Sequence, residues 1–266
     1  MQLVRQHKYS INLHYCVLKF LLVCLLHVPL ILRRIIIDKA MLRQAWWKIL
    51  SCILLIYTCT MGFLVKIPVL DGRLQQSIRN LFFHVPMWFC MQTLFIVSVI
   101  YAIQYLRKPG SSYDFYSLEY ARTGVIFGLL GLITGAIWAN YQWGQPWSGD
   151  PKQNGAAIAI LIYLAYFVLR GSVTDETKRA RLGAVYNIFA FAMLFPTIWI
   201  LPRLTESLHP GGQGSEGNPA LNGSDLAPEM RMVFWPAVFG WTLLGVWITT
   251  LRIRLHIYKE KLTGHA

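Results

Sequence analysis

Six long apolar segments follow one another from residue 46 onward, separated by shorter polar or charged stretches. A transmembrane helix needs roughly 20 consecutive apolar residues, and each segment is close to that length and nearly free of charge. Backbone in lipid must satisfy its own hydrogen bonds, which favours helices. The pattern therefore predicts an all-α integral membrane protein, a bundle of six transmembrane helices. The predicted spans are 46–65, 85–106, 122–139, 153–170, 182–201 and 232–251.

The composition agrees with a membrane protein. Of the 266 residues, 55% are hydrophobic and only 14% are charged, whereas about 25% are charged in ordinary soluble domains. The net charge of +13 does not indicate nucleic-acid binding, because the Lys and Arg side chains lie in small groups beside apolar runs. We therefore expect membrane lipid as a partner and no nucleic acid.

The five cysteines form no Cys-x-x-Cys pair and are expected to be packing residues: Cys16, Cys24, Cys52, Cys59 and Cys90.

Basic residues near span ends set the orientation of a membrane protein. Counted this way, Lys and Arg favour one side of the six spans about two to one. We predict that this side is cytoplasmic, so both ends of the six-span core are cytoplasmic and three loops face outward. The outward loops are 66–84, 140–152 and 202–230, the last with a Gly, Pro, Asn and Ser-rich stretch expected to be mobile.

Residues 1–40 do not fit the pattern cleanly and are treated as an uncertain N-terminal extension. Their longest uncharged run, 20–32, has 13 residues, which is too short for an ordinary span. A signal-like segment, an interfacial helix, a seventh span and an upstream extension of the reading frame all remain open. We favour the last, with a start at Met41. The predicted domains are then a six-span domain over 41–255 and a cytoplasmic tail over 256–266.

The outer loops concentrate the unusual chemistry. One histidine precedes Pro86, which suits the first turn of the second span, and another lies near the start of the last loop. The middle loop holds three tryptophans and a tyrosine within ten residues. An aromatic belt at the membrane surface explains aromatics near span ends but does not require them within the loop itself. Two imidazoles and a flat aromatic platform on one side suggest haem, and interfacial residues without a ligand are the alternative. These candidates are His84, His209, Trp138, Tyr141, Trp143 and Trp147.

The middle loop resembles the tryptophan-rich WWD signature of the CcmC/CcsA haem-handling family. The matching residues are Trp138, Trp143, Gly144, Trp147 and the run 150–152, Asp-Pro-Lys. The family also has one histidine in the outer loop before this motif and one in the loop after it, the places of His84 and His209. The resemblance covers about 41–255. Many members have a tryptophan where this chain has Gly149, so part of the platform is either lost or supplied by Tyr141.

Two branches of this family differ in length and in histidines. CcsA-type synthetases have more spans and an additional pair of histidines within the membrane. The resemblance is therefore to the smaller branch, cytochrome c maturation protein C or haem exporter protein C. The remaining histidines of this chain, none of which lies inside the six predicted spans, are His7, His14, His27, His256 and His265.

The resemblance implies a role in c-type cytochrome biogenesis at a bacterial inner membrane. Haem b would be held non-covalently at the periplasmic face and presented to the haem chaperone CcmE, with the transporter subunits CcmA and CcmB and the small single-span CcmD as further partners. His84 and His209 would be the axial iron ligands, and Trp138, Trp143 and Trp147 would cover the porphyrin. Asp150 is expected to cap the fourth span or orient the platform. Arg79 and Arg203 are candidate partners of the propionates.

Three other functions stay open. A haem lyase of the CcsA type would be an enzyme, but the lack of histidines inside the spans disfavours it. A cytochrome b-like electron-transfer subunit would carry histidine pairs within its helices. An assembly subunit without any ligand is the third. We expect no enzymatic activity, and no ATPase activity of its own, because the chain has no Gly-x-x-x-x-Gly-Lys-Ser/Thr loop.

Overall fold

The computed structural model describes residues 44–262, apart from 71, 111 and 210–225. Within that part of the chain the regular structure is entirely helical, and six helical stretches are long and apolar enough to cross a membrane. The six-helix prediction is thus confirmed. The stretches are α3 (Trp46–Leu64), η2 with α5 (Ile78–Asn80, Leu81–Arg107), α6 (Tyr113–Trp143), α7 (Pro151–Ser172), α8 with η3 and α9 (Glu176–Ala192, Phe195–Ile200, Leu201–Leu204) and α10 (Pro228–Leu262).

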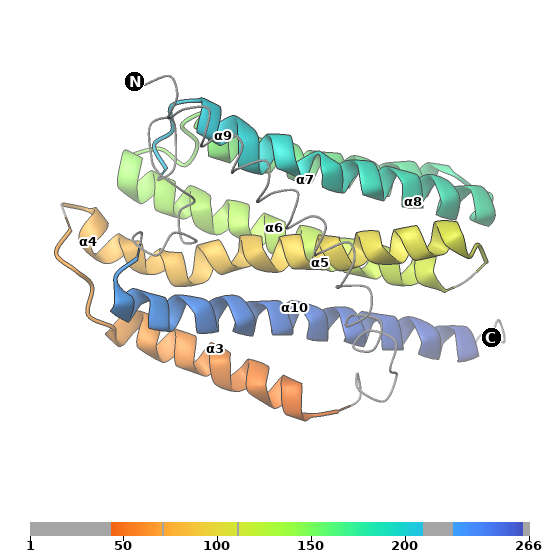
Figure 1. The fold of residues 1–266 in the computed structure, drawn as a ribbon, viewed down its shortest axis with the longest axis horizontal. Coiled ribbons are helices and arrows are strands. Elements are labelled where there is room, and N and C mark those ends of the chain that lie inside the picture. Colours follow the sequence, from red (N-terminus) through yellow and green to blue (C-terminus); the bar gives the residue numbers. More distant parts are fainter. Residues whose placement is uncertain (1–43, 71, 111, 210–225, 263–266) are drawn as a thin grey trace, which may run out of the picture. The chain divides into compact units, whose positions relative to one another are not determined.

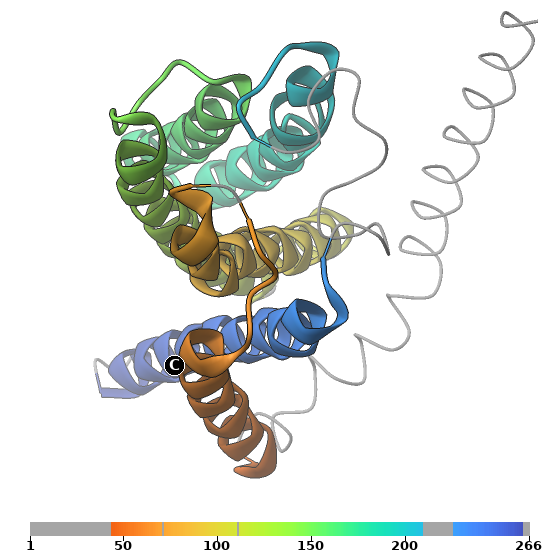
Figure 2. The ribbon, with the colours of Figure 1, turned by 90° about the vertical axis from the view of Figure 1, so that its left-hand side faces the viewer.

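The helices run side by side and alternate in direction (Figure 1). α5 packs against α6 and α10, α3 packs against α10, and α7 packs against α8. Figure 2 shows the start of α7 beside α9 at one end of the bundle. The short helix α4 (Leu74–Ser77), the end of α6 and the start of α10 lie at that same end. We call it the outer end and the opposite one the inner end. The described parts of the three predicted outward loops all lie at the outer end.

The predicted spans differ from the helices at their ends. α6 continues to Trp143, so three of the four aromatic candidates lie on a helix rather than in a loop. α5 begins at Leu81 and contains Pro86, so the expectation that this proline lies in the first turn is wrong. The 3-10 turn η2 leads directly into α5, which starts the helix earlier than the apolar pattern does. Predictions for 1–40 and for most of 210–228 lie outside the described residues.

Small residues on α6 let α5 approach closely. A Cβ added at Gly131 would lie 2.8 Å from Trp88 Cε2, and one at Gly135 would lie 2.7 Å from His84 Cε1. Helices in lipid associate through such close packing, because there is no hydrophobic drive between them. The ring of His84 is therefore fixed against the backbone of α6.

Ion pairs join the helices near the inner end. Arg170 of α7 forms a bidentate pair with Asp114 of α6, with two N···O distances of 2.7 Å. The buried carboxylate of Glu119 accepts hydrogen bonds from Arg122 of α6 and Arg252 of α10. These arginines belong to the group that we counted as orientation signals, and the structure adds that they connect three helices.

Candidate functional site

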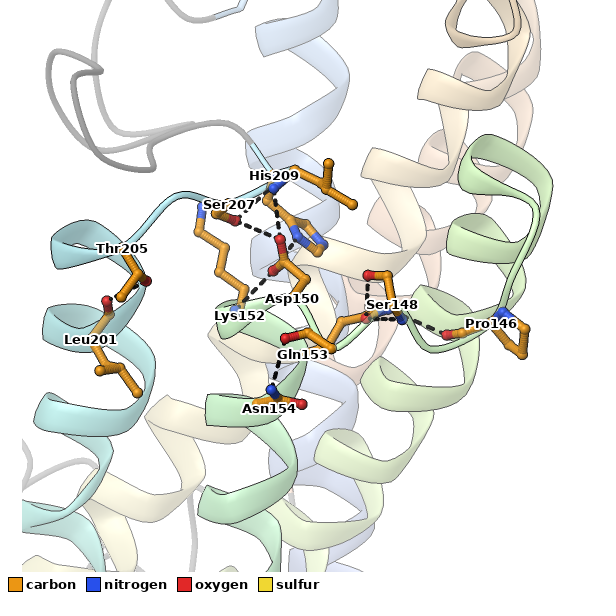
Figure 3. Close-up of polar contacts among 12 residues, drawn as sticks. Pro146, Ser148, Asp150, Lys152, Gln153, Asn154, Leu201, Thr205, Ser207 and His209 are labelled. Atoms are coloured by element: carbon orange, nitrogen blue, oxygen red, sulfur yellow. Dashed lines mark hydrogen bonds and ion pairs between the residues drawn. The ribbon is translucent and has the colours of Figure 1, made fainter.

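The outer end brings His209 against Asp150, which directly precedes α7 (Figure 3). The distance from His209 Nδ1 to Asp150 Oδ1 is 2.9 Å. The Asp150 carboxylate is fully buried, and the His209 side chain keeps one fifth of its surface exposed. An acidic oxygen beside Nδ1 fixes both the orientation of the ring and its tautomer, with the proton on Nδ1. The lone pair of Nε2 is then available to a ligand.

Asp150 also organises the backbone around it. Oδ1 accepts the Lys152 N–H at 2.9 Å, which makes Asp150 the N-cap of α7. Oδ2 accepts the Ser207 hydroxyl at 2.9 Å and the Leu208 N–H at 2.7 Å. The expected helix cap is therefore present. The same carboxylate also holds the segment that carries His209.

The electrostatics of this pair follow from burial and from these contacts. Burial alone would raise the pKa of the Asp150 carboxyl, but the facing His209 and the hydrogen bonds from Lys152, Ser207 and Leu208 lower it below its usual value. Burial lowers the pKa of His209, and the attraction of Asp150 only partly opposes this shift. Near neutral pH the pair is thus a carboxylate and a neutral imidazole, the form that binds a metal ion.

His84 has an analogous partner on α6. Its Nδ1 lies 3.1 Å from Thr134 Oγ1. The Thr134 hydroxyl donates to the Leu130 carbonyl at 2.8 Å, so its oxygen accepts from His84. With Thr134 Oγ1 as the acceptor, the proton of the His84 ring is on Nδ1, and Nε2 is the nitrogen left for a ligand. Both histidines present the same nitrogen, and each is held by a hydrogen bond at the other nitrogen, as metal-binding histidines usually are.

Two of the tryptophans of the motif, Trp138 and Trp143, contact the ring of His209. Trp138 and Trp143 contact each other edge to face, with ring centroids 5.2 Å apart. Their centroids lie 6.2 and 4.9 Å from that of His209. Trp147 and Tyr141 are exposed. Both residues lie on the last turns of α6, and their ring planes are 78° apart, so these two indoles alone do not form one flat surface.

The two arginines proposed for propionates differ in their surroundings. Arg79 donates from Nη1 to the carbonyls of Gly62 and Val65, at 2.9 and 3.0 Å, where α3 ends. Its position is thus explained by capping α3. Arg203 lies on α9 at the outer end and forms no ion pair or hydrogen bond with the other described residues. Arg203 remains a candidate for a carboxylate ligand.

The sequence pattern does not predict two residues that form hydrogen bonds with the histidines. Thr134 lies one turn before Trp138 on α6, and Ser207 lies two residues before His209. A threonine in a span and a serine in a loop are too common to stand out. The helical spacing of Thr134 and Trp138 was the available signal, because it places both on one face of α6.

The observed donors fit haem. Two neutral imidazoles at one end of the bundle each keep Nε2 available, and indoles lie around one of them. Haem iron takes imidazole nitrogen as an axial ligand, and aromatic faces suit a planar apolar ring. The fold defines a multi-pass membrane protein, and the donors at its outer end are of the kind that haem iron accepts.

Comparison with known proteins identifies the family. The profile of the cytochrome c assembly protein family matches residues 11–209, and the chain belongs to this family. Haem exporter protein C of Haemophilus influenzae is 25% identical over 71% of this chain and 75% of its own length. The haem exporter protein C of Paracoccus denitrificans is 24% identical over 76% and 81%. The cytochrome c biogenesis protein CcsA of Trachelium caeruleum is 28% identical over 62% of this chain but only 50% of its own length.

Membership in this family gives the chain a role in c-type cytochrome biogenesis and in haem handling. The six apolar helices make it a multi-pass membrane protein. The two haem exporters are matched over most of their length, whereas the CcsA protein is matched over half. This difference agrees with the smaller branch, which the length and the histidines of the chain indicate.

Proposed function

We propose that the chain binds haem b non-covalently at its outer end and presents it to a haem chaperone. His84 and His209 would hold the haem iron, each through Nε2. Trp138 and Trp143 cover the porphyrin, and Trp147 and Tyr141 extend this surface toward the partner. The bound haem supplies an iron centre and a vinyl edge. The residues of the chain hold it, orient it and limit the access of water.

The matched environments of the two histidines carry this proposal. His209 donates to a buried carboxylate and His84 donates to a threonine hydroxyl that is already engaged. These contacts fix the orientation of each ring and of its other nitrogen. Arg203 lies at the same end and suits a propionate, since guanidinium pairs well with carboxylates.

The partners and location follow from the same proposal. The relatives named haem exporter protein C support partners from a haem export system. The resemblance of the tryptophan-rich loop adds CcmE as the proposed acceptor of haem and CcmA, CcmB and CcmD as proposed neighbours in the membrane. A bacterial inner membrane with the outer end in the periplasm agrees with the charge asymmetry of the loops. Any step driven by ATP then belongs to a partner, because the chain has no phosphate-binding loop.

Absorption spectra of the purified protein test the proposal. The full chain is expressed with the chaperone and compared with His84→Ala and His209→Ala. We expect a sharp Soret band and resolved α and β bands after reduction, weakened or shifted in both variants. His256→Ala is the matched control, because His256 lies near the C-terminal end of α10, at the inner end, against Phe115.

Three results would argue against the proposal. A spectrum that is the same in all four proteins removes these histidines as ligands. An equal change in the His256→Ala control indicates general loss of structure. A folded preparation without any haem favours an assembly subunit with no ligand of its own.

A further inference from the structure

A hydrogen bond inside the membrane joins the helix of His84 to the segment that leads to His209. Trp199 Nε1 in η3 donates to Gln92 Oε1 in α5 at 2.8 Å. Gln92 Nε2 donates to the Trp88 carbonyl at 3.3 Å, so the amide oxygen is the atom turned to the indole. Both residues lie in apolar spans. The polar groups of the pair thus find partners where water is scarce.

The fifth span changes from α-helix to π-helix in the segment that contains Trp199, the partner of Gln92. α8 ends at Ala192, and Phe195–Ile200 forms the π-helix η3, with Pro196 near its start. A proline removes one backbone donor, which permits a wider turn. One extra residue in a helix rotates the residues that follow by about 100°. Such turns are rare and often lie at functional sites, and here the turn contains the tryptophan that contacts α5.

The bond connects two groups of elements that each hold one histidine. η3 packs on α7, where a Cβ on Gly155 would lie 2.0 Å from the Thr197 carbonyl oxygen. α7 also begins at the Asp150 cap, which holds His209. His84 belongs instead to α5, which packs on α6. Deeper in the membrane the fifth span touches α5 again, where Asn187 donates to Ser98 at 2.7 Å.

We propose that Gln92 and Trp199 are positioning residues for the haem site. Their hydrogen bond closes this site on its membrane side and fixes the His209 segment relative to the helix of His84. Gln92 follows His84 by eight residues, about 12 Å along α5, so the pair lies deeper in the membrane than either histidine. This inference rests on the proposed function.

Carbon monoxide binding measures the positioning. The full-length protein is loaded with hemin and reduced, and carbon monoxide is added below saturation. Haem with two histidine ligands must release one of them before it can bind carbon monoxide. We expect Gln92→Leu and Trp199→Phe each to raise the carbon monoxide-bound fraction about fivefold, which corresponds to about 1 kcal/mol. The double variant should match either single variant, since only one bond is lost.

A matched control and a haem-free measurement separate positioning from general loosening. Gln104→Leu changes the same residue type in the same helix near the inner end, where its buried Oε1 has no partner among the described residues. This variant should leave carbon monoxide binding unchanged. In the haem-free protein, amide hydrogen exchange over 201–209 should rise in Gln92→Leu and Trp199→Phe but not in Gln104→Leu.

Several results would overturn the inference. Carbon monoxide binding that stays unchanged in both Gln92→Leu and Trp199→Phe excludes a positioning role. An equal rise in Gln104→Leu, or additive effects in the double variant, indicates general loosening. If the haem spectra of the unaltered protein and of His84→Ala are the same, the proposed function itself fails. That failure is recognised separately, from the unaltered protein and His84→Ala alone.

Discussion

The substitution Asp150→Asn tests the central contact of the site. The Asp150 oxygens accept four hydrogen bonds: Oδ1 from Lys152 N–H and His209 Nδ1–H, and Oδ2 from Ser207 O–H and Leu208 N–H. An asparagine keeps the shape but replaces one acceptor oxygen with an NH2 donor. Whichever way the amide turns, its NH2 group faces one backbone N–H, of Lys152 or of Leu208, and that hydrogen bond is lost. The other group it faces, His209 Nδ1 or the Ser207 hydroxyl, can accept from it, but for His209 this moves the ring proton to Nε2.

The size of the effect follows from these contacts. A hydrogen bond to a charged group contributes about 1.5–3 kcal/mol, so losing one removes roughly 1.5–3 kcal/mol before any relaxation. The His209 side chain is one fifth exposed, so water replaces part of that loss. We expect about 1.4–2.8 kcal/mol to remain as weaker haem binding. This corresponds to a 10- to 100-fold rise in Kd, the usual effect of losing a carboxylate behind a metal-binding histidine.

Hemin titration of the detergent-purified protein, followed at the Soret band, measures this Kd. Asp175→Asn is the matched control, because Asp175 caps α8 by accepting the Lys178 N–H and is exposed. It thus loses the same kind of cap without a histidine partner. An unchanged Kd and spectrum in Asp150→Asn, or an equal loss in Asp175→Asn, would refute the reasoning.

Three further predictions concern the other contacts of the bundle. Thr134→Val removes the acceptor of His84 Nδ1–H and should raise the hemin Kd about tenfold in the same titration. Gly135→Ala places a methyl group 2.7 Å from His84 Cε1, so it should shift the Soret band by displacing that ring. Asp114→Asn leaves Arg170 buried without its ion pair and should destabilise the protein by about 3–5 kcal/mol, measured by thermal unfolding in detergent.

Each of these predictions has a control in the same chain. Thr60→Val also removes a hydroxyl that donates to its own helix, in exposed α3, and should leave hemin binding unchanged. Gly171→Ala adds a methyl group where nothing lies within 4 Å. Glu176→Gln breaks the exposed pair with Arg179 and should change stability by less than about 1 kcal/mol. Equal effects in a test variant and its control would contradict the corresponding explanation.

The apolar pattern was sufficient to predict the six spans and to predict which loops lie at the same end of the bundle. Hydrophobic length determines whether a helix can cross the membrane, and alternating direction then places every second loop at the same end. His84, Trp138 and Asp150 could therefore be assigned to one end without any structure. The same pattern could not give helix ends, because α6 continues past the apolar stretch to Trp143. Aromatic residues suit both a helix end and a loop at the membrane surface.

The sequence pattern also does not predict the π-helix of the fifth span. Pro196 marks a disturbed helix, but a proline inside a span is compatible with a kink or a simple distortion. Only packing on α7, at Gly155, and the hydrogen bond to Gln92 distinguish the observed turn from these alternatives. The sequence also does not predict that Arg79 caps the end of α3, because this contact depends on how η2 packs against α3.

The sequence by itself determined that this chain is a membrane bundle with two histidines and a tryptophan-rich motif at one end, because local hydrophobicity and charge control span number and topology. The tertiary structure decided which atoms those residues present. The proton positions on His84 and His209 depend on Thr134 and Asp150, which are separated from them by 50 and 59 residues. Side-chain hydrogen bonds over such separations follow from helix packing, which no local pattern encodes.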